Sequence, residues 1–125
     1  MPKFSWIEFL ILARELGERN NKESALRSSI SRAYYAAYNA AKAYCVEKNI
    51  QVFKVKGSHE DLWDALQRED NILLRMASVK GDRLRRKRAL ADYEEEVDGL
   101  VPTVERCLDE SHEILKTLGL PSPPP

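Results

Sequence analysis

Residues 31–43 have the sequence SRAYYAAYNAAKA, which is dense in alanine and tyrosine. Alanine is the strongest helix former, and its small side chain lets a neighbouring helix approach closely. Apolar residues at three- and four-residue spacing continue the pattern on both sides, from Leu26 and Ile30 to Tyr44. This spacing predicts one long amphipathic helix over about residues 22–48.

Helical spacing recurs on both sides of this segment, and no convincing strand is apparent. Helices are expected over residues 5–19 and 83–95, from residue 58 to beyond Leu66, and from a start between residues 99 and 102 to residue 118. A further apolar segment covers residues 72–81. Ser5 and Glu8 have the spacing of a capping box, and Ser58 is an expected N-cap. Gly81 is expected to end the apolar segment and Asp82 to cap the next helix.

These elements predict an all-α fold, an antiparallel, up-and-down bundle of four to five helices. The 125 residues suit one domain, which we place at residues 1–119. The proline-rich end, residues 120–125, is expected to be a disordered tail.

Composition excludes several classes of protein. The 20 basic and 20 acidic side chains cancel, which argues against a protein that coats nucleic acid with general positive charge. There is no apolar run long enough to span a membrane and no paired-cysteine or other metal or cofactor motif, and we expect no signal peptide because the first residues lack its long apolar stretch. We therefore expect a cytoplasmic domain with free thiols at Cys45 and Cys107, and no metal or cofactor.

A basic run over residues 80–88 holds six positive side chains in nine positions. On a helix, Arg85 and Arg88 share a face with Asp92, and arginine side chains can clamp a phosphate. An acidic run follows at residues 92–98, so the alternative is that the two runs neutralise each other or form solvated faces.

Two further features carry polar or aromatic chemistry. Tyr34, Tyr35 and Tyr38 lie on adjacent faces of one helix, so at least one should reach a polar partner or an interface. Packing and dimerisation explain them more simply than stacking on bases. His59 lies at an expected helix N-terminus, where it serves either acid–base chemistry or local capping and packing.

Together these pieces resemble the HEPN domain family. Residues 32–36 are similar to its R-x-Y-Y-A helix, residues 57–59 to the Gly-Ser-His that opens the next helix, and residues 88–93 to the R-x-x-A-D-Y form of small prokaryotic members. The order and spacing agree over about residues 5–118. The tyrosine-pair helix combined with the late R-x-x-A-D-Y is the specific part of the match.

The resemblance implies a homodimer formed through the long helices and a role linked to RNA or nucleotides. Many members are metal-independent ribonucleases, often toxins in toxin–antitoxin or other defence pairs. Small members are often encoded beside a minimal nucleotidyltransferase, which would then be the partner. The implied RNA- or nucleotide-binding residues are Arg85, Arg88 and Arg32, and the expected dimer contacts are Tyr34, Tyr35 and Tyr38.

The chain departs from the family at the catalytic motif. Active members carry an arginine, four to six residues and then a histidine on the helix that here holds Arg88, and no histidine follows at that interval. Metal-free RNA cleavage needs a proton acceptor and stabilisation of phosphate charge. The candidates are Arg88, Asp92, Tyr93 and His59. The spacing of Arg106 and His112 fits the motif, but on a different helix, and we treat it as accidental.

Three interpretations therefore stay open at the level of sequence. The first is a dimer that binds RNA or a nucleotide and, if it is an enzyme, cleaves RNA without metal. The second is a non-catalytic helical module that docks a nucleotidyltransferase. The third is a helical dimer without a nucleic-acid ligand.

Overall fold

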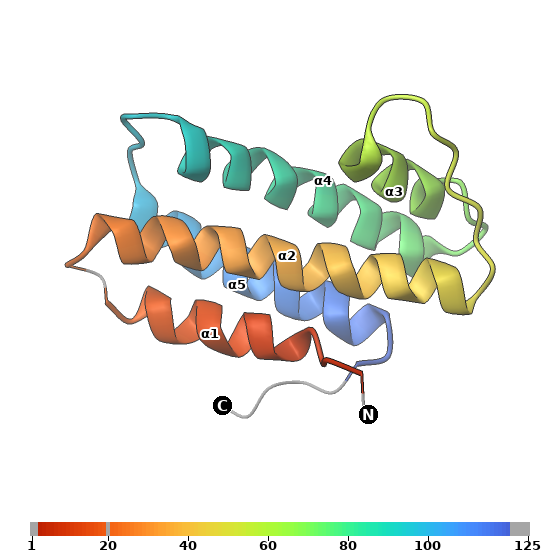
Figure 1. Cartoon of the computed structure of the whole chain (residues 1–125), viewed down its shortest axis with the longest axis horizontal. Helices are drawn as coiled ribbons and strands as arrows, with labels where there is room; N and C mark the ends of the chain where they lie inside the picture. The colour runs from red at the N-terminus through yellow and green to blue at the C-terminus, as the bar shows by residue number, and fades with distance from the viewer. Residues whose placement is uncertain (1–2, 20, 121–125) are drawn as a thin grey trace.

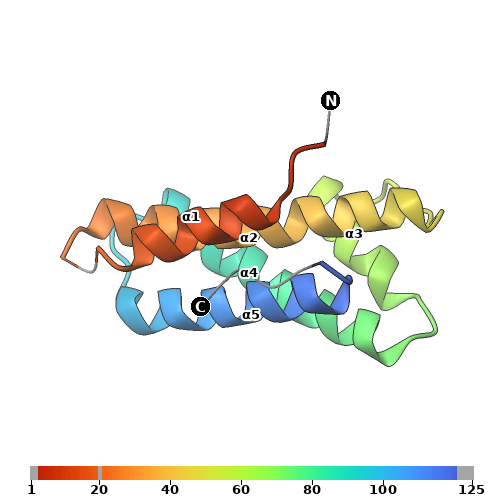
Figure 2. The ribbon, with the colours of Figure 1, turned by 90° about the horizontal axis from the view of Figure 1, so that it is seen from below.

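Five α-helices form the protein in a computed structural model that describes residues 3–19 and 21–120 (Figure 1). They are α1 (Ile7–Gly17), α2 (Glu23–Glu47), α3 (Ser58–Gln67), α4 (Ile72–Tyr93) and α5 (Leu100–Thr117). The four long helices alternate in direction, α3 lies at one end beside α4, and the described residues contain no strand (Figures 1 and 2). The predicted all-α antiparallel bundle is confirmed.

Helix α2 is the centre of the bundle because it packs against all four other helices. Its alanines at 33, 36, 37 and 41 are fully buried, which gives the close approach that the sequence predicts. Two buried serines tie neighbouring helices to it. Ser29 Oγ donates to the Ala13 carbonyl of α1 at 2.6 Å, and Ser111 Oγ of α5 donates to the Ala33 carbonyl at 2.7 Å.

Helix α4 is one continuous element, which corrects the predicted break at Gly81 and the cap at Asp82. Gly81 is buried because the ring of Trp63 lies directly on it, and a methyl group there would be 2.5 Å from the ring. The glycine therefore serves close packing of α3 on α4, and Ser78 Oγ strengthens the contact by donating to the Trp63 carbonyl at 2.7 Å. Asn71 is the observed cap of this helix, with its side chain accepting from the amides of Leu73 and Leu74.

The other two predicted caps also differ from the structure. Helix α1 begins after Trp6 without a side-chain cap, and the Glu8 amide instead donates to the Ser5 carbonyl at 3.1 Å. Ser58 is the first residue of α3 rather than its cap, and the preceding Gly57 has φ of 149°. The chain before α3 is held by a different device, the buried carboxylate of Asp61, which the last subsection of Results describes.

Residues 49–57 form a loop without strand pairing and join α2 to α3. The predicted disordered tail falls mostly on residues 121–125, which lie outside the described residues. No helix of the described chain is long and apolar enough to cross a membrane. Cys45 and Cys107 are both free and buried, in agreement with the sequence.

Candidate functional site

The candidate site is a cluster around Arg88 of α4, whose side chain lies between helices although it carries a charge. Arg88 keeps only 9% of its exposure. Its guanidinium carbon lies 5.4 Å from the ring centres of both Tyr34 and Tyr35 and 5.9 Å from that of Tyr93. Aromatic faces attract a cation electrostatically, so three rings frame the guanidinium.

The hydrogen-bonding capacity of this buried guanidinium is largely unused. Its ion pair is with Asp92, one helical turn on, at the long Nη1–Oδ2 distance of 3.6 Å. Asp92 also accepts from Ser31 Oγ at 3.4 Å. The Nε of Arg88 has no partner among the described residues. A buried donor without a partner is unfavourable, and a functional role, an ordered water or an ion is among its explanations.

His59 joins the same aromatic frame from the first turn of α3. Its ring stacks on Tyr38 at 4.4 Å between centres, and its Nδ1 lies 2.7 Å from the Tyr34 hydroxyl oxygen. Helix α3 thus brings His59 to the tyrosines that also frame the Arg88 guanidinium, although the two residues are far apart in sequence.

The hydrogen bonds around Tyr34 determine which nitrogen of His59 carries the proton. The indole N–H of Trp63 can only donate, and it donates to the Tyr34 hydroxyl oxygen at 3.3 Å. Burial raises the pKa of Tyr34, so this hydroxyl keeps its proton, and we assign it as the donor to Nδ1 of His59 because this nitrogen is the acceptor within reach among the described residues. Neutral His59 therefore carries its proton on Nε2. The imidazole offers an N–H donor from this nitrogen rather than a free lone pair.

The charge state of His59 follows from its surroundings. Burial lowers the pKa of His59 below its ordinary 6.5, and the nearby charges of Arg88 and Arg85 lower it further. The imidazole is therefore neutral at pH 7. This arrangement avoids adding a third positive charge to the cluster, at the expense of making protonation of His59 unfavourable in the folded state.

A pH titration of stability tests this environment. Because the pKa of His59 is lower in the folded than in the unfolded chain, the unfolded chain binds more protons between the two pKa values. We expect the free energy of unfolding to be constant above about pH 7.5 with respect to this group, and to decrease as the pH falls through 6.5 towards the folded pKa of His59. Urea unfolding between pH 5 and pH 8 measures this. The slope should disappear in His59→Gln and persist in His112→Gln; the reverse pattern would contradict the assignment.

The structure brings some of the sequence-predicted residues together and separates others. Arg85 is held by Asp82 at 2.9 Å and lies 3.8 Å from Glu60, so part of its charge is neutralised beside the cluster. Arg32 lies apart from this cluster, and its predicted role in RNA or nucleotide binding stays a prediction. Its guanidinium lies over the ring of Phe9 at 5.0 Å, on α1, and α1 makes no contact with α4.

The three tyrosines of α2 serve mainly the interior of the chain. Tyr34 is fully buried and Tyr38 keeps 9% of its exposure, so they offer little or no surface to a second copy. The ring and hydroxyl of Tyr34 are already used by Arg88, His59 and Trp63, whereas the predicted role of the three tyrosines in a dimer stays a prediction. Tyr35 is half-buried and keeps part of its surface.

Within the part of the chain that the structure describes, no ion pair joins the acidic residues after Asp92 to the basic run. Arg27 of α2 instead binds the end of α4, donating to the carbonyls of Ala91 at 2.9 Å and of Glu95 at 3.0 Å, and to that of Glu94. A cation at a helix C-terminus is favoured by the exposed carbonyls and the helix dipole. This contact fixes the turn of α4 that carries Asp92 and Tyr93.

Trp63 is the site residue that the sequence did not single out. It is 1% exposed, touches Gly81 and donates to Tyr34, so it positions both α3 and the proton on His59. In the sequence it appears only as one of the apolar residues of a short helix. Among the described residues, no group of three or more histidine, cysteine or acidic side chains could hold a metal.

The fold and this cluster define an all-α bundle in which an arginine and a histidine meet within a cage of tyrosines. A family model, that of the HEPN domain, matches residues 7–120. The chain belongs to the HEPN domain family and is a protein of this ribonuclease-related type, which confirms the resemblance seen in the sequence. Comparisons with curated proteins and with solved structures found no match.

Proposed function

We propose that this HEPN protein binds RNA through a phosphate held at the Arg88 cluster and does not cleave it efficiently. The observation that carries the proposal is the buried guanidinium of Arg88, which has one long ion pair and an Nε without a partner among the described residues. A phosphate that reaches the exposed part of this guanidinium adds acceptors to the single long ion pair with Asp92, and charge-assisted hydrogen bonds from arginine to phosphate are among the strongest in proteins.

Two neighbours of Arg88 extend the same chemistry. Neutral His59 offers its Nε2–H, a second donor in the tyrosine frame. Tyr93 is 75% exposed and its ring lies near the Arg88 guanidinium. An exposed aromatic ring beside a phosphate-binding arginine suits the stacking of an unpaired base. Single-stranded RNA is therefore the ligand class that this arrangement favours.

Cleavage is disfavoured because no group in the cluster is ready to accept the proton of a 2′-hydroxyl. In the tautomer assigned above, Nδ1 of His59 accepts from Tyr34 and Nε2 carries the proton. Asp92 is engaged by Arg88 and Ser31. Deprotonating a 2′-hydroxyl here would require the tautomer of His59 to change first and the Tyr34 hydroxyl to find a new acceptor.

An RNA-binding titration tests the proposal. Labelled single-stranded RNA is titrated without added metal against the wild type, Arg88→Ala and Arg83→Ala. Arg83 is the matched control because it lies on the same helix, carries the same charge and pairs instead with Glu110 of α5 at 3.1 Å. We expect Arg88→Ala to weaken binding at least tenfold and Arg83→Ala to change it less than threefold.

The outcomes of this titration separate the alternatives. Equal weakening in both variants would show that only general charge matters, and absence of binding by the wild type would overturn the proposal. Cleavage by the wild type that is lost in Arg88→Ala would overturn its non-catalytic part. His59 would then become the acid–base candidate, with Asp92 and Tyr93 as the alternatives.

We further propose that the protein works as a homodimer, as part of a pair with a minimal nucleotidyltransferase of the toxin–antitoxin or defence kind. The first half of α4 supports a protein partner, since Ile72, Leu73, Met76 and Val79 expose between 46% and 64% of their surface. Contiguous exposed apolar side chains are typical of interfaces. Light scattering on the same samples tests the dimer, and a monomeric mass would overturn it.

A further inference from the structure

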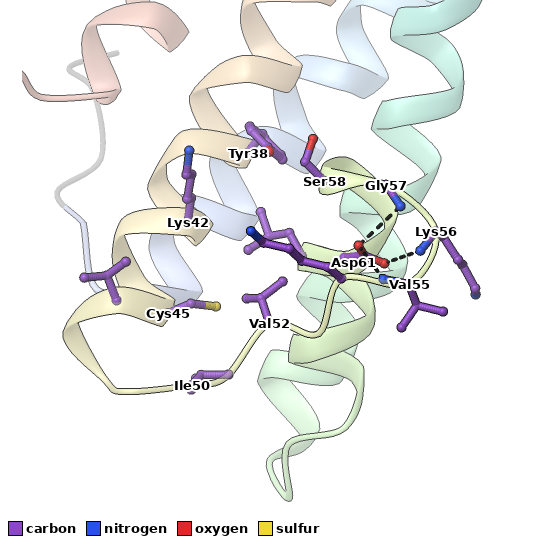
Figure 3. A pocket seen from close by; sticks show the side chains of 13 residues that line it. Tyr38, Lys42, Cys45, Ile50, Val52, Val55, Lys56, Gly57, Ser58 and Asp61 are labelled. Atoms are coloured by element: carbon purple, nitrogen blue, oxygen red, sulfur yellow. Dashed lines mark hydrogen bonds between the residues drawn. The ribbon is translucent and has the colours of Figure 1, made fainter.

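A second site lies at the other side of Tyr38, in a cavity of about 790 Å³ that the Arg88 cluster does not use (Figure 3). Its walls come from the second half of α2, from the loop over residues 50–57 and from the start of α3. Cavities of this size accommodate small organic ligands. The loop forms one wall of the cavity, so three segments of the chain surround it rather than a single helix.

The interior of the cavity is apolar. Ile50, Val52 and Leu62 line it together with the sulfur of Cys45, which points inward from α2 (Figure 3). Burial raises the pKa of the Cys45 thiol to about 11, with a further contribution from Glu69, so at neutral pH this side chain is an uncharged, weakly polar group. The inner surface therefore favours a hydrocarbon or aromatic body.

The charged groups at the same cavity leave an excess of positive charge. Lys42 of α2 and Lys54 of the loop line it and make no ion pair within the described residues. Lys56 is neutralised by Asp64 at 3.1 Å. The remaining carboxylate, that of Asp61, faces the loop amides and is already satisfied by them. An anionic group is therefore the natural complement at this cavity.

Asp61 also determines which kind of anion fits. Its carboxylate accepts from the amides of Lys56 at 2.9 Å, Val55 at 3.0 Å and Gly57 at 3.2 Å (Figure 3), and these bonds hold its pKa below the usual value. Converging amides of this kind are what a phosphate uses in other proteins. Here an internal carboxylate occupies them, so an entering anion has two lysine side chains and no amide cradle.

We propose that this cavity binds a small hydrophobic carboxylate, with its apolar body against Ile50, Val52 and Leu62 and its carboxylate near Lys42 and Lys54. Polyphosphates fit less well, because the loop amides are taken by Asp61. The proposal does not rest on RNA binding at Arg88, since the residues that carry it are different. The two sites meet at Tyr38, which lines the cavity and stacks on His59.

Displacement of a fluorescent probe tests this site. The intact protein is titrated with 1-anilinonaphthalene-8-sulfonate, an aromatic anion, and the probe is then displaced with decanoate, decanol or ATP. We expect decanoate to displace it at a concentration at least tenfold lower than decanol does, and ATP to leave it bound. Displacement by ATP would overturn the choice of a carboxylate, and equal displacement by decanol would overturn the role of the lysines.

Two variants locate the binding within the molecule. Lys42→Gln with Lys54→Gln should weaken decanoate about tenfold, since each partly exposed ion pair contributes modestly. The control, Lys22→Gln with Lys116→Gln, removes two exposed lysines outside the cavity and should leave the affinity unchanged. Val52→Trp should fill the cavity and abolish displacement. If Val52→Trp does not fold, the lysine pair decides, and equal affinity in the two lysine variants would overturn the proposal.

Discussion

Gly81→Ala should lower the free energy of unfolding by about 2 kcal/mol, although alanine normally stabilises the interior of a helix by about 1 kcal/mol relative to glycine. The reason is the contact between α3 and α4. A methyl group at this position would lie 2.5 Å from three ring atoms of Trp63. That ring is 1% exposed and its backbone is held by Ser78, so it has nowhere to retreat.

Two comparisons isolate this contact in urea unfolding. Ala89→Gly, at a half-buried position on the same helix, should cost about 1 kcal/mol, mainly from helix propensity. In a Trp63→Leu background, Gly81→Ala should lose its penalty, because the smaller side chain leaves room for the methyl group. An increase in stability on Gly81→Ala in the wild-type background would show that the two helices are not packed this closely.

Gly81 also shows which feature of this fold the sequence alone does not predict, namely whether a glycine ends a helix or packs against a neighbouring ring. The boundaries of α2 and α5 agree with the predicted ranges to within about two residues, because repetitive apolar spacing over many turns determines a helix without help from its neighbours. A glycine followed by an aspartate has the same local signature whether it ends a helix or admits a neighbouring ring. Only the position of Trp63 in three dimensions distinguishes these two uses.

The same limit applies to the helix caps. Ser5 and Ser58 are good cap residues by type, yet neither caps a helix with its side chain, and the loop before α3 is secured by Asp61 instead. A carboxylate in the first turn of a helix is expected from the helix dipole. That it binds three loop amides follows from the path of the loop, which residue type alone does not give.

Some contacts of the candidate site could also be predicted from the sequence, and others could not. Arg88 and Asp92 are one helical turn apart, so their pairing follows from the sequence. The approach of His59 to the tyrosine frame depends on how α3 packs on α2 and α4, and the proton on its Nε2 depends on Trp63. The family resemblance identifies Arg88 and shows that the histidine of the motif is missing from its helix. Only the structure shows that His59, from another helix, lies against the same tyrosines.

Arg88→Met should weaken RNA binding at least tenfold, as Arg88→Ala does, and at the same time leave stability unchanged or raise it by about 1 kcal/mol. A buried guanidinium with a 3.6 Å ion pair and an unpartnered Nε loses more hydration than its contacts return. Methionine keeps an apolar side chain of similar length against Tyr34 and Tyr35, while Asp92 remains exposed enough to be solvated. Some attraction to the three rings is lost, which limits the gain.

The direction of these two effects decides what Arg88 is for. A residue kept for the fold would lose stability on substitution, whereas a residue kept for a ligand trades stability for binding. Urea unfolding and the RNA titration on the same preparation measure both, with Arg88→Lys as the intermediate case, since lysine keeps the charge but lacks the planar fork. A loss of more than about 2 kcal/mol in Arg88→Met would mean that the tyrosine cage and Asp92 stabilise the guanidinium fully. Arg88 would then be a structural residue, and phosphate binding would have to be sought elsewhere on the molecule.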